Sequence, residues 1–248
     1  MQKFFVKSEQ IHDNTIEVMG EDVNHIKNVL RYKVGEEVLA GNEATGESYS
    51  CQIKEIEKEK VVLNIISKIE QSNEPKTYVH IFQGLPKADK MEHIIQKGTE
   101  IGVAEFTPVS LSRSIVKLEG KESLKKIERW QKIAETAAKQ CKRDRIPKIN
   151  CVQNLKKLYE ILKEYDIVLV AYEEEEENSL KAEIQKYMDI KEKNLKIAII
   201  VGPEGGLAKE EVDAIKEIGG IAVTLGKRIL RTETAPLVMS TILLYEFE

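Results

Sequence analysis

The sequence predicts an α/β protein in which a mainly parallel sheet covered by helices follows a small antiparallel β-domain. Before residue 70, short extended runs with polar alternation are separated by glycines, which is typical of a small barrel or sandwich. From Tyr78 onward, apolar strand-like runs alternate with amphipathic helical segments, which is the pattern of a parallel sheet. The polar segment Gln71–Lys76 contains a proline and separates the two patterns, so we predict domains over residues 1–72 and 73–248.

The first domain is predicted to consist of short strands interrupted by one helix. The helix covers Asp22–Arg31, where Val23, Ile26 and Leu30 recur at helical spacing. Glycines punctuate the extended runs. The predicted strands are Lys3–Val6, Thr15–Met19, Glu37–Ala40, Ser48–Ile56 and Val61–Ile66.

Strands and helices alternate through the second domain. The predicted strands are Tyr78–Gln83, Glu105–Val109, Ile149–Val152, Asp166–Ala171, Leu195–Val201 and Ile221–Leu225. The predicted helices are Ala88–Ile101, Lys121–Cys141, Leu155–Tyr165, Leu180–Met188, Lys209–Ile218 and Leu237–Phe247. The last helix is apolar on much of its surface, so we expect it to be deeply buried or to pack against a second subunit.

Composition narrows the class of protein. The chain has 248 residues, 42% hydrophobic and 32% charged, which favours two domains over one. It has no apolar run long enough to cross a bilayer, and its first residues lack the features of a signal peptide, so we expect a soluble cytoplasmic protein without a membrane partner. The three cysteines and four histidines show no metal-ligand spacing, so we expect no metal and no disulfide framework.

Positive charge is concentrated in the middle of an acidic chain. Residues 76–150 hold 16 Lys or Arg and 9 Asp or Glu, whereas the whole chain carries a net charge of -4. The densest part is Lys139–Lys148, with five cations in ten residues. This segment could bind a polyanion. It could equally reflect the ordinary preference of cations for a helix C-terminus and a solvated loop.

A glycine-rich loop, Gly202–Gly206, follows a predicted strand and precedes a helix, which is a common ligand site in α/β sheets. It matches neither the Walker A pattern GxxxxGK[ST] nor the dinucleotide-binding pattern GxGxxG, which are two common phosphate-binding loops. Glu204 in the loop and Glu210 and Glu211 in the next helical turn would repel a pyrophosphate. The loop therefore predicts a neutral or cationic ligand, such as adenosine joined to a sulfonium-bearing amino acid. A tight turn with acidic residues at a helix start would explain the carboxylates, but not the glycines.

The second candidate loop, Leu225–Pro236, joins the last strand to the final helix. Arg228, Arg231 and Glu233 are candidate functional residues because the carboxyl ends of parallel strands carry the chemistry of such sheets. Alternatively, the loop serves to cap the final helix through Thr232 or Thr234, and the two roles are compatible.

An acidic run, Glu173–Glu177, directly follows a predicted strand. We interpret most of these carboxylates as a solvated loop. Asn178 and Ser179 could then cap the next helix.

These segments resemble the RsmE family of bacterial ribosomal RNA uridine-N3 methyltransferases, members of the SPOUT class. The resemblance covers nearly the whole chain. It is strongest at IIVGPEGGLAKEEV (Ile199–Val212) and LGKRILRTETAPL (Leu225–Leu237). Supporting strings are KGTEIGVAEFTPV (Lys97–Val109), AAKQCKRDRIPKI (Ala137–Ile149) and HIKNVLRYKVGEEV (His25–Val38).

The resemblance implies an N-terminal PUA-like β-barrel for RNA, a SPOUT α/β domain with a trefoil knot, and a homodimer. It also implies S-adenosylmethionine as cofactor. The implied cofactor-binding residues are Leu169, Ala171, Tyr172, Gly202, Pro203, Glu204, Gly205, Gly206, Leu225, Gly226, Ile229, Leu230, Arg231 and Ala235.

RNA contacts are predicted at Lys3, Arg31, Lys87, Lys97, Arg113, Lys142, Arg143 and Arg145. Two of these positions depart from the family's pattern. The family often has arginine where this chain has Lys3, and commonly glycine where Lys142 stands. A lysine keeps the charge but lacks the planar fork that arginine offers to a phosphate or a base.

The implied reaction is methylation of N3 of a uridine in 16S ribosomal RNA. The base must be unpaired or flipped, and negative charge develops on it as the N3 proton leaves. Arg231 or Arg228 could stabilise that charge, and Glu233 could act as the base or could orient an arginine. Two alternatives are a non-catalytic RNA-binding or ribosome-assembly module and a methyltransferase that acts on transfer RNA.

Overall fold

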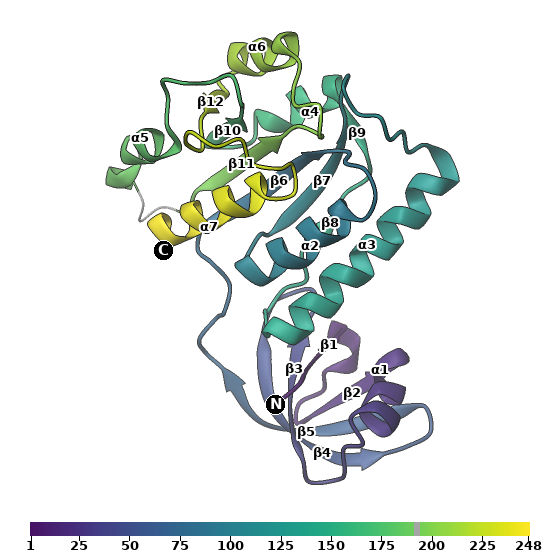
Figure 1. Cartoon of the computed structure of the whole chain (residues 1–248). Coiled ribbons are helices and arrows are strands. Elements are labelled where there is room, and N and C mark those ends of the chain that lie inside the picture. The colour runs from purple at the N-terminus through teal and green to yellow at the C-terminus, as the bar shows by residue number, and fades with distance from the viewer. Residues whose placement is uncertain (191–193) are drawn as a thin grey trace. The chain divides into compact units, whose positions relative to one another are not determined.

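The computed structural model describes residues 1–190 and 194–248, which form two compact units (Figure 1). The first unit comprises Met1–Glu74 together with Ala138–Ile146, and the second comprises Pro75–Ala137 together with Pro147–Glu248. The first unit therefore includes a segment from the middle of the chain. This segment contains most of the basic stretch that the sequence analysis singled out.

The first unit contains a five-stranded sheet in the order β1-β3-β4-β5-β2. Only the β1–β3 pair is parallel. The strands are β1 (Lys3–Val6), β2 (Thr15–Met19), β3 (Glu37–Asn42), β4 (Ser48–Ile56) and β5 (Lys60–Ile69). The short helical pieces are η1 (Ser8–Gln10), α1 (Glu21–Asn24) and the π-helical turn η2 (His25–Val29), so the predicted helix over Asp22–Arg31 is present but irregular.

Alternation of side chains along the strands builds the core of this unit. In β2, Ile16 and Val18 are buried while Thr15 and Glu17 are partly exposed, as expected for successive side chains that point to opposite faces. The other core residues are Phe4, Val6, Val23, Ile26, Val38, Ala40, Cys51, Ile53, Val61 and Leu63.

The second unit contains a parallel sheet in the order β12-β10-β11-β6-β7-β8, with β9 also paired to β7. The predicted parallel sheet is thereby confirmed. Its strands are β6 (Tyr78–Gly84), β7 (Glu105–Ser110), β8 (Lys148–Ile149), β9 (Gln153–Asn154), β10 (Ile167–Ala171), β11 (Lys196–Val201) and β12 (Ile221–Val223). Of the strand predicted over Ile149–Val152, only Ile149 lies in a strand, as the last residue of β8, and β9 begins after the predicted segment.

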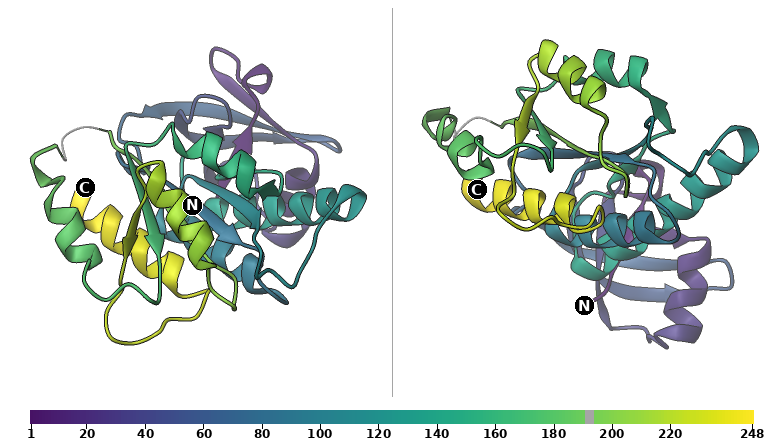
Figure 2. Two further views of the ribbon diagram at one scale, coloured as in Figure 1. Left: turned by 90° about the horizontal axis from the view of Figure 1, so that it is seen from above. Right: turned by 45° about the horizontal axis from the view of Figure 1, so that its top comes forward.

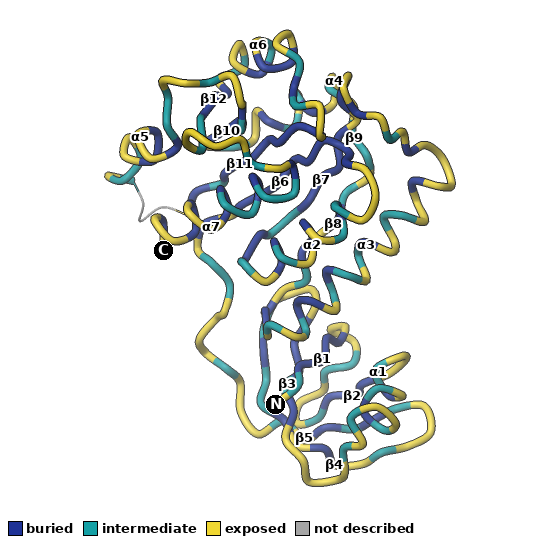
Figure 3. Tube along the Cα trace, in the orientation of Figure 1, coloured by how far each residue is buried: buried dark blue, intermediate teal, exposed yellow. Residues whose placement is uncertain are grey.

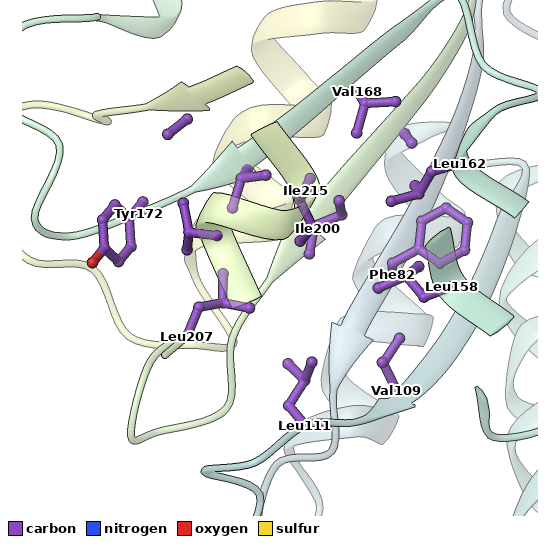
Figure 4. Packing of buried hydrophobic residues seen from close by; sticks show 14 residues of the cluster. Phe82, Val109, Leu111, Leu158, Leu162, Val168, Tyr172, Ile200, Leu207 and Ile215 are labelled. Atoms are coloured by element: carbon purple, nitrogen blue, oxygen red, sulfur yellow. The ribbon is translucent and has the colours of Figure 1, made fainter. Parts of the chain in front are cut away.

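Helices cover both faces of this sheet (Figure 2). One face carries α4 and α6, whose apolar side chains pack on Phe82 and Ile200 (Figure 4). On the other face, α7 contacts α2, α5, β6 and β11. The helices are α2 (Lys90–Ile101), α3 (Gly120–Cys141), α4 (Leu155–Leu162), α5 (Leu180–Gln185), α6 (Lys209–Glu217) and α7 (Ala235–Phe247), with the short η3 (Met188–Ile190) after α5.

Two of the helix starts show side-chain caps. Asn154 Oδ1 accepts from the Lys157 amide at 2.9 Å, and Ser179 Oγ accepts from the Ala182 amide at 3.1 Å. The predicted cap by Ser179 is confirmed. Thr234 precedes α7 but makes no side-chain capping bond, so the predicted hydroxyl cap of the final helix is wrong.

The final helix is buried along one side, so it is not deeply buried all round, which was one of the two outcomes expected of it. Met239, Leu243, Leu244 and Phe247 are buried, whereas Tyr245 is exposed. Figure 3 shows the contrast between the buried central strands and the exposed loops. Within the described residues, no helix is both long and apolar enough to span a bilayer.

Candidate functional site

A cavity of about 530 Å³ lies at the carboxyl edge of the parallel sheet. The sheet order places β10 between β12 and β11, with β6 beside β11, so the loops that follow these four strands meet at one edge. Every residue predicted to bind cofactor lines the cavity except Leu169, which is buried in β10. The other lining residues are Lys90, Glu173, Val201, Val223, Thr224, Arg228 and Thr232.

Glycine is required in the first loop because the loop folds back on itself. A Cβ on Gly202 would lie 2.6 Å from the carbonyl carbon of Gly206. Gly206 has a φ of +70°, and its amide donates to the Pro203 carbonyl at 2.9 Å. The glycines therefore allow a tight turn in the wall of the cavity.

A buried hydrogen-bond network joins the two predicted loops. Thr232 Oγ1 donates to the Gly202 carbonyl at 2.6 Å. Gln83 Nε2, at the end of β6, donates to Thr232 Oγ1 at 2.9 Å. Because Gln83 and Thr232 are both buried, these bonds are shielded from competing water. Thr232 thus fastens the second loop to the first.

The second loop forms an exposed wall of the cavity. Gly226 has a φ of +105°, and a Cβ built on it would meet nothing within 4 Å, so its Cα borders open space. Ile229 is 85% exposed although it is a large apolar residue. Such an apolar side chain beside a cavity is available to cover a ligand.

The carboxylates near the first loop differ in their environments. Glu211 is buried and accepts hydrogen bonds from the Ala208 amide at 2.9 Å and the Ser112 amide at 2.8 Å. Glu210 is exposed and does not line the cavity. The predicted repulsion of a pyrophosphate by three carboxylates therefore applies to Glu204 alone among the three.

Glu204 lies in the cavity wall and is partly neutralised. Its Oε1 accepts from the Lys87 amide at 3.0 Å and from Lys90 Nζ at 2.9 Å. Burial raises the pKa of Glu204, but the hydrogen bonds from Lys90 and the backbone outweigh this effect and hold the pKa below its usual value. Glu204 is thus held as a carboxylate.

Glu173 is a cavity carboxylate that sequence reasoning missed. It belongs to the acidic run predicted to be a solvated loop, yet it lines the cavity. Its Oε1 lies 1.9 Å from where a Cβ on Gly206 would stand, so the side chain rests on the first loop. The available signal was its position directly after the end of β10, a strand next to the glycine-rich loop.

The three residues predicted to be catalytic are close together but not equivalent. Arg228 and Arg231 line the cavity, and the Arg231 side chain is 83% exposed. Glu233 is outside the lining and is largely buried. Its Oε1 lies 3.9 Å from Arg231 Nη1, and its Oε2 lies 3.4 Å from Lys90 Nζ. Glu233 therefore stands behind two cations that reach the cavity.

Burial corrects two of the residues predicted to contact RNA. Lys3 is buried, and its Nζ donates to Ser48 Oγ at 2.7 Å and to Asp144 Oδ1 at 2.5 Å. Arg143 is also buried and is paired with Glu74. Neither cation is presented to a phosphate, because folding has already supplied each with a carboxylate partner.

The remaining predicted RNA residues are more accessible. Arg31, Lys142 and Arg145 are exposed in the first unit, and Lys87 and Arg113 are exposed in the second. Lys97 is half-buried and paired with Glu100. Arg113 Nη1 donates to the Gly205 carbonyl at 3.0 Å, which places this cation beside the first loop.

The conformation of Lys142 explains one departure from the family's pattern. Its φ is +61°, in the left-handed region that glycine adopts most readily. It directly follows the last residue of α3, the position at which helices commonly end on glycine. Lys142 adopts this conformation at some energetic cost, which a glycine at this position would avoid.

The described part of the chain contains no group of three or more His, Cys, Asp or Glu side chains placed to hold a metal ion. Cys141 and Cys151 are at least partly accessible, and Cys51 is buried, all as free thiols. Burial raises the pKa of the Cys51 thiol to about 12. Cys51 is therefore a protonated core residue.

Comparison with known proteins gives matches along the whole chain. The family model described as RNA methyltransferase domain matches residues 72–244, and the one described as RNA methyltransferase PUA domain matches residues 19–66. Ribosomal RNA small subunit methyltransferase E from Bacillus subtilis is 39% identical over 100% of this chain and 98% of its own length. The protein of that name from Mesomycoplasma hyopneumoniae is 34% identical over 97% of this chain and 98% of its own.

A solved structure extends the likeness to three dimensions. The structure of a ribosomal RNA small subunit methyltransferase E from Neisseria gonorrhoeae, bound to S-adenosylmethionine, superposes with a TM-score of 0.84. It is 29% identical and covers 98% of this chain and 96% of its own.

Proposed function

This chain belongs to the ribosomal RNA small subunit methyltransferase E family, and from that premise we propose that it transfers a methyl group from S-adenosylmethionine to N3 of a uridine in 16S ribosomal RNA. One observation carries the proposal. The two loops through which the sequence resembles the family fold together around one cavity. A relative of the same fold binds S-adenosylmethionine.

The cavity suits the proposed cofactor in size and charge. Its volume of about 530 Å³ lies within the range typical of small-molecule sites. Gly226 leaves open space where a side chain would stand, and Ile229 and Leu230 supply apolar surface. Glu173 adds a carboxylate without a basic partner among the described residues, which favours a cationic ligand. The bound cofactor would supply a methyl group activated by its sulfonium.

The proposed site residues divide by position. We assign cofactor binding to the lining residues of the two loops and of the end of β10. Leu169, which is buried in β10, would support these residues from within the sheet. Arg231 and Arg228 would stabilise the negative charge that spreads over the uracil oxygens as N3 loses its proton. Because Glu233 contacts Arg231 and does not line the cavity, the geometry favours an orienting role for it over that of a base.

Three finer features of the fold are also proposed. A PUA-like barrel is supported by contacts between the end strands β1 and β2 of the first sheet. A trefoil knot is supported by the fastening of the second loop to Gly202 and by the passage of the chain from α6 to α7 on opposite faces. A homodimer is supported by the exposure of Ile242 and Tyr245 on the final helix.

The proposed RNA contacts are the accessible cations. Lys87 and Arg113 border the first loop, and Arg31, Lys142 and Arg145 are exposed on the first unit. We place Lys97 with them, although it is paired with Glu100. Each such cation would hold the RNA backbone and would contribute to a salt-dependent affinity. We place the activity in the cytoplasm, where ribosomal subunits are assembled.

The decisive experiment on substrate compares ribosomal RNA from cells with and without the gene by mass spectrometry. We expect one 3-methyluridine of 16S RNA to vanish in the deletion strain and to return with the wild-type gene. Loss of a transfer RNA modification would instead support the alternative substrate. If every modification persists and calorimetry detects no binding of S-adenosylmethionine, the chain is a non-catalytic RNA binder.

A variant tests the assignment of Arg231. Arg231→Ala should lower kcat by roughly 10²- to 10³-fold, as loss of a preorganised charge-stabilising donor does, and should leave the binding of S-adenosylmethionine measurable. Single-turnover methyl transfer and calorimetry report the two quantities separately. Unchanged turnover would remove Arg231 from the reaction.

A further inference from the structure

A third loop, for which the sequence analysis predicted an RNA contact at Lys87 and a helix start at Ala88, directly precedes the cavity residue Lys90. Residues 85–89 follow β6 and lead into α2. Within this loop Ala88 has a φ of +56°, in the left-handed region that residues with a side chain rarely adopt. Such backbone conformations persist only where the surrounding structure imposes them, and they cluster at functional sites. Here the amide of Lys87 is held by Glu204 Oε1 at 3.0 Å.

Lys90 directly follows this loop as the first residue of α2, and it lines the cavity. Its Nζ lies 2.9 Å from Glu204 Oε1 and 3.4 Å from Glu233 Oε2. Glu204 belongs to the first loop and Glu233 to the second, so one ammonium group connects all three loops. Lys90 itself lines the cavity, whereas Glu233 does not.

The surroundings of Lys90 keep it charged and fixed. The hydrogen bond from Lys90 to Glu204 raises the pKa of the ammonium, and the charge of Glu233 adds to this effect. The side chain is 27% exposed, compared with 83% for Arg231. Lys90 is thus the better restrained of these two cavity cations, and restraint is what makes a charge effective in a transition state.

Lys90 also retains hydrogen-bonding capacity. An ammonium group has three donors, and the structure gives one hydrogen bond from Lys90, to Glu204. The contact with Glu233 is an ion pair without hydrogen-bond geometry, because Glu233 Oε2 accepts no hydrogen bond from any residue in the described ranges. An oxygen that enters the cavity can therefore bind to the remaining donors.

We infer that Lys90 is a further catalytic residue, whose ammonium, oriented by Glu204 and Glu233, binds an oxygen of the acceptor uracil and stabilises the negative charge on it. The inference rests on the proposed function, since it requires an acceptor base in this cavity. It assigns Glu233 the role of a positioning residue that acts through Lys90 as well as through Arg231.

The test compares Lys90→Met with wild type on 30S subunits purified from a strain that lacks the gene. We expect kcat to fall by roughly 10²-fold, as for the loss of one preorganised donor. Calorimetry with S-adenosylmethionine should give a Kd within about threefold of wild type, and the urea midpoint should stay close to wild type. Lys90→Arg, which keeps the charge, should recover at least part of the lost rate.

Lys163→Met provides a matched control. Lys163 is a surface lysine in an i,i+3 ion pair with Glu160, and it is remote from the lining of the cavity. Its loss should leave kcat and the Kd for S-adenosylmethionine unchanged. A fall in rate in both variants would show that the effect of Lys90→Met is not local, and would overturn the inference.

A double-mutant cycle with Glu233→Gln separates orientation from independent action. If Glu233 acts partly through Lys90, adding Glu233→Gln to Lys90→Met should lower kcat by less than Glu233→Gln lowers it in wild type. The remaining decrease would be the part of the effect of Glu233 that is exerted through Arg231. Fully additive effects would overturn the proposed link between the two residues.

Three other outcomes would contradict the role of Lys90. Turnover of Lys90→Met within twofold of wild type would exclude a catalytic contribution. A raised KM for RNA with an unchanged kcat and a shallower salt dependence would identify a phosphate contact instead. A Kd for S-adenosylmethionine weakened more than tenfold would identify a cofactor-binding residue. If wild type neither binds S-adenosylmethionine nor methylates the subunit, the proposed function fails together with the inference.

Discussion

The Lys3–Asp144 pair in the first unit and the Lys90–Glu204–Glu233 cluster in the second both join a lysine to carboxylates from distant parts of the chain. In the first pair the side chains are 1% and 3% exposed, and Asp144 also accepts from Ser48 Oγ and the Asn73 amide. In the second cluster every member is partly exposed, and Glu233 Oε2 lacks a hydrogen-bond donor among the described residues.

This difference separates an ion pair that stabilises a fold from one that can serve a reaction. In the fully buried pair Lys3 Nζ makes two hydrogen bonds and Asp144 accepts from four groups, because an unpaired charge there would be very costly. The lysine at the wall of the cavity keeps unused donors, and a ligand can bind to them. The number of satisfied hydrogen bonds is therefore as informative as the distance between the charges.

Breaking the buried pair should have the largest effect on stability. Lys3→Met leaves Asp144 buried without its cation and should lower the free energy of unfolding by about 3–5 kcal/mol. Urea unfolding followed by circular dichroism measures the change, with Lys163→Met as a control expected to stay within about 0.5 kcal/mol. A loss below about 1 kcal/mol for Lys3→Met would place this pair with ordinary surface pairs and would break the comparison.

The contribution of the same pair to stability should also depend on pH, with a smaller effect than that of Lys3→Met. Burial raises the pKa of Asp144, but hydrogen bonds from Lys3, Ser48 and the Asn73 amide outweigh it, so the folded-state pKa lies below the ordinary value. The resulting stability is present above the unfolded-state pKa of about 3.9 and is lost as pH falls through the lower folded-state value. Urea midpoints should therefore fall less steeply below about pH 4 in Asp144→Asn than in wild type. Equal acid slopes would contradict this linkage.

The hydrogen bonds that join the two cavity loops should contribute less to the free energy of unfolding than the buried ion pair does. Thr232→Val keeps the shape of the side chain but removes the hydroxyl between Gln83 Nε2 and the Gly202 carbonyl, which leaves that carbonyl only the longer bond from Gln83 Nε2 at 3.3 Å. The free energy of unfolding should fall by about 1–3 kcal/mol, and S-adenosylmethionine should bind more weakly. Thr241→Val, which removes an exposed hydroxyl bonded to the Leu237 carbonyl, is the control. Equal effects of the two variants would show that burial of this network adds nothing.

The smallest effects concern backbone strain, which Arg31 and Lys142 show in the first unit and Ala88 shows in the second. Ala88→Gly and Lys142→Gly should each raise the free energy of unfolding by about 0.5–1 kcal/mol, because left-handed φ values suit glycine better than a residue with a Cβ. Thermal unfolding measures both. Destabilisation by either change would mean that side-chain contacts at that position outweigh the relief of strain.

Much of the fold followed from local pattern. Periodicity located every sheet strand to within a few residues except at Ile149–Val152, where two two-residue strands pair with β7. Such short strands carry too few residues for alternation to be recognised. The first cavity loop was located by its glycines and its place after a strand, and the second by its place after a strand and its charged residues. Glu173 was missed because a run of five carboxylates resembles a solvated loop.

The roles of charged residues were less accessible to sequence reasoning. Lys3, Arg143 and Lys90 look alike in sequence, as cations within or next to predicted elements. The first two proved to be buried in ion pairs, and the third lines the cavity. Glu211 looked like a cavity carboxylate and is instead bonded to two backbone amides.

The sequence by itself determined the alternation of strands and helices, the positions of the two loops and, through their motifs, the family. These features depend on residues that are near one another in the chain. Only the tertiary structure decided which cations are buried, that Thr232 fastens one loop to the other, and that Lys90 joins Glu204 and Glu233. Burial and pairing depend on groups separated by many residues, such as Lys3 and Asp144, and periodicity does not record which distant residues meet.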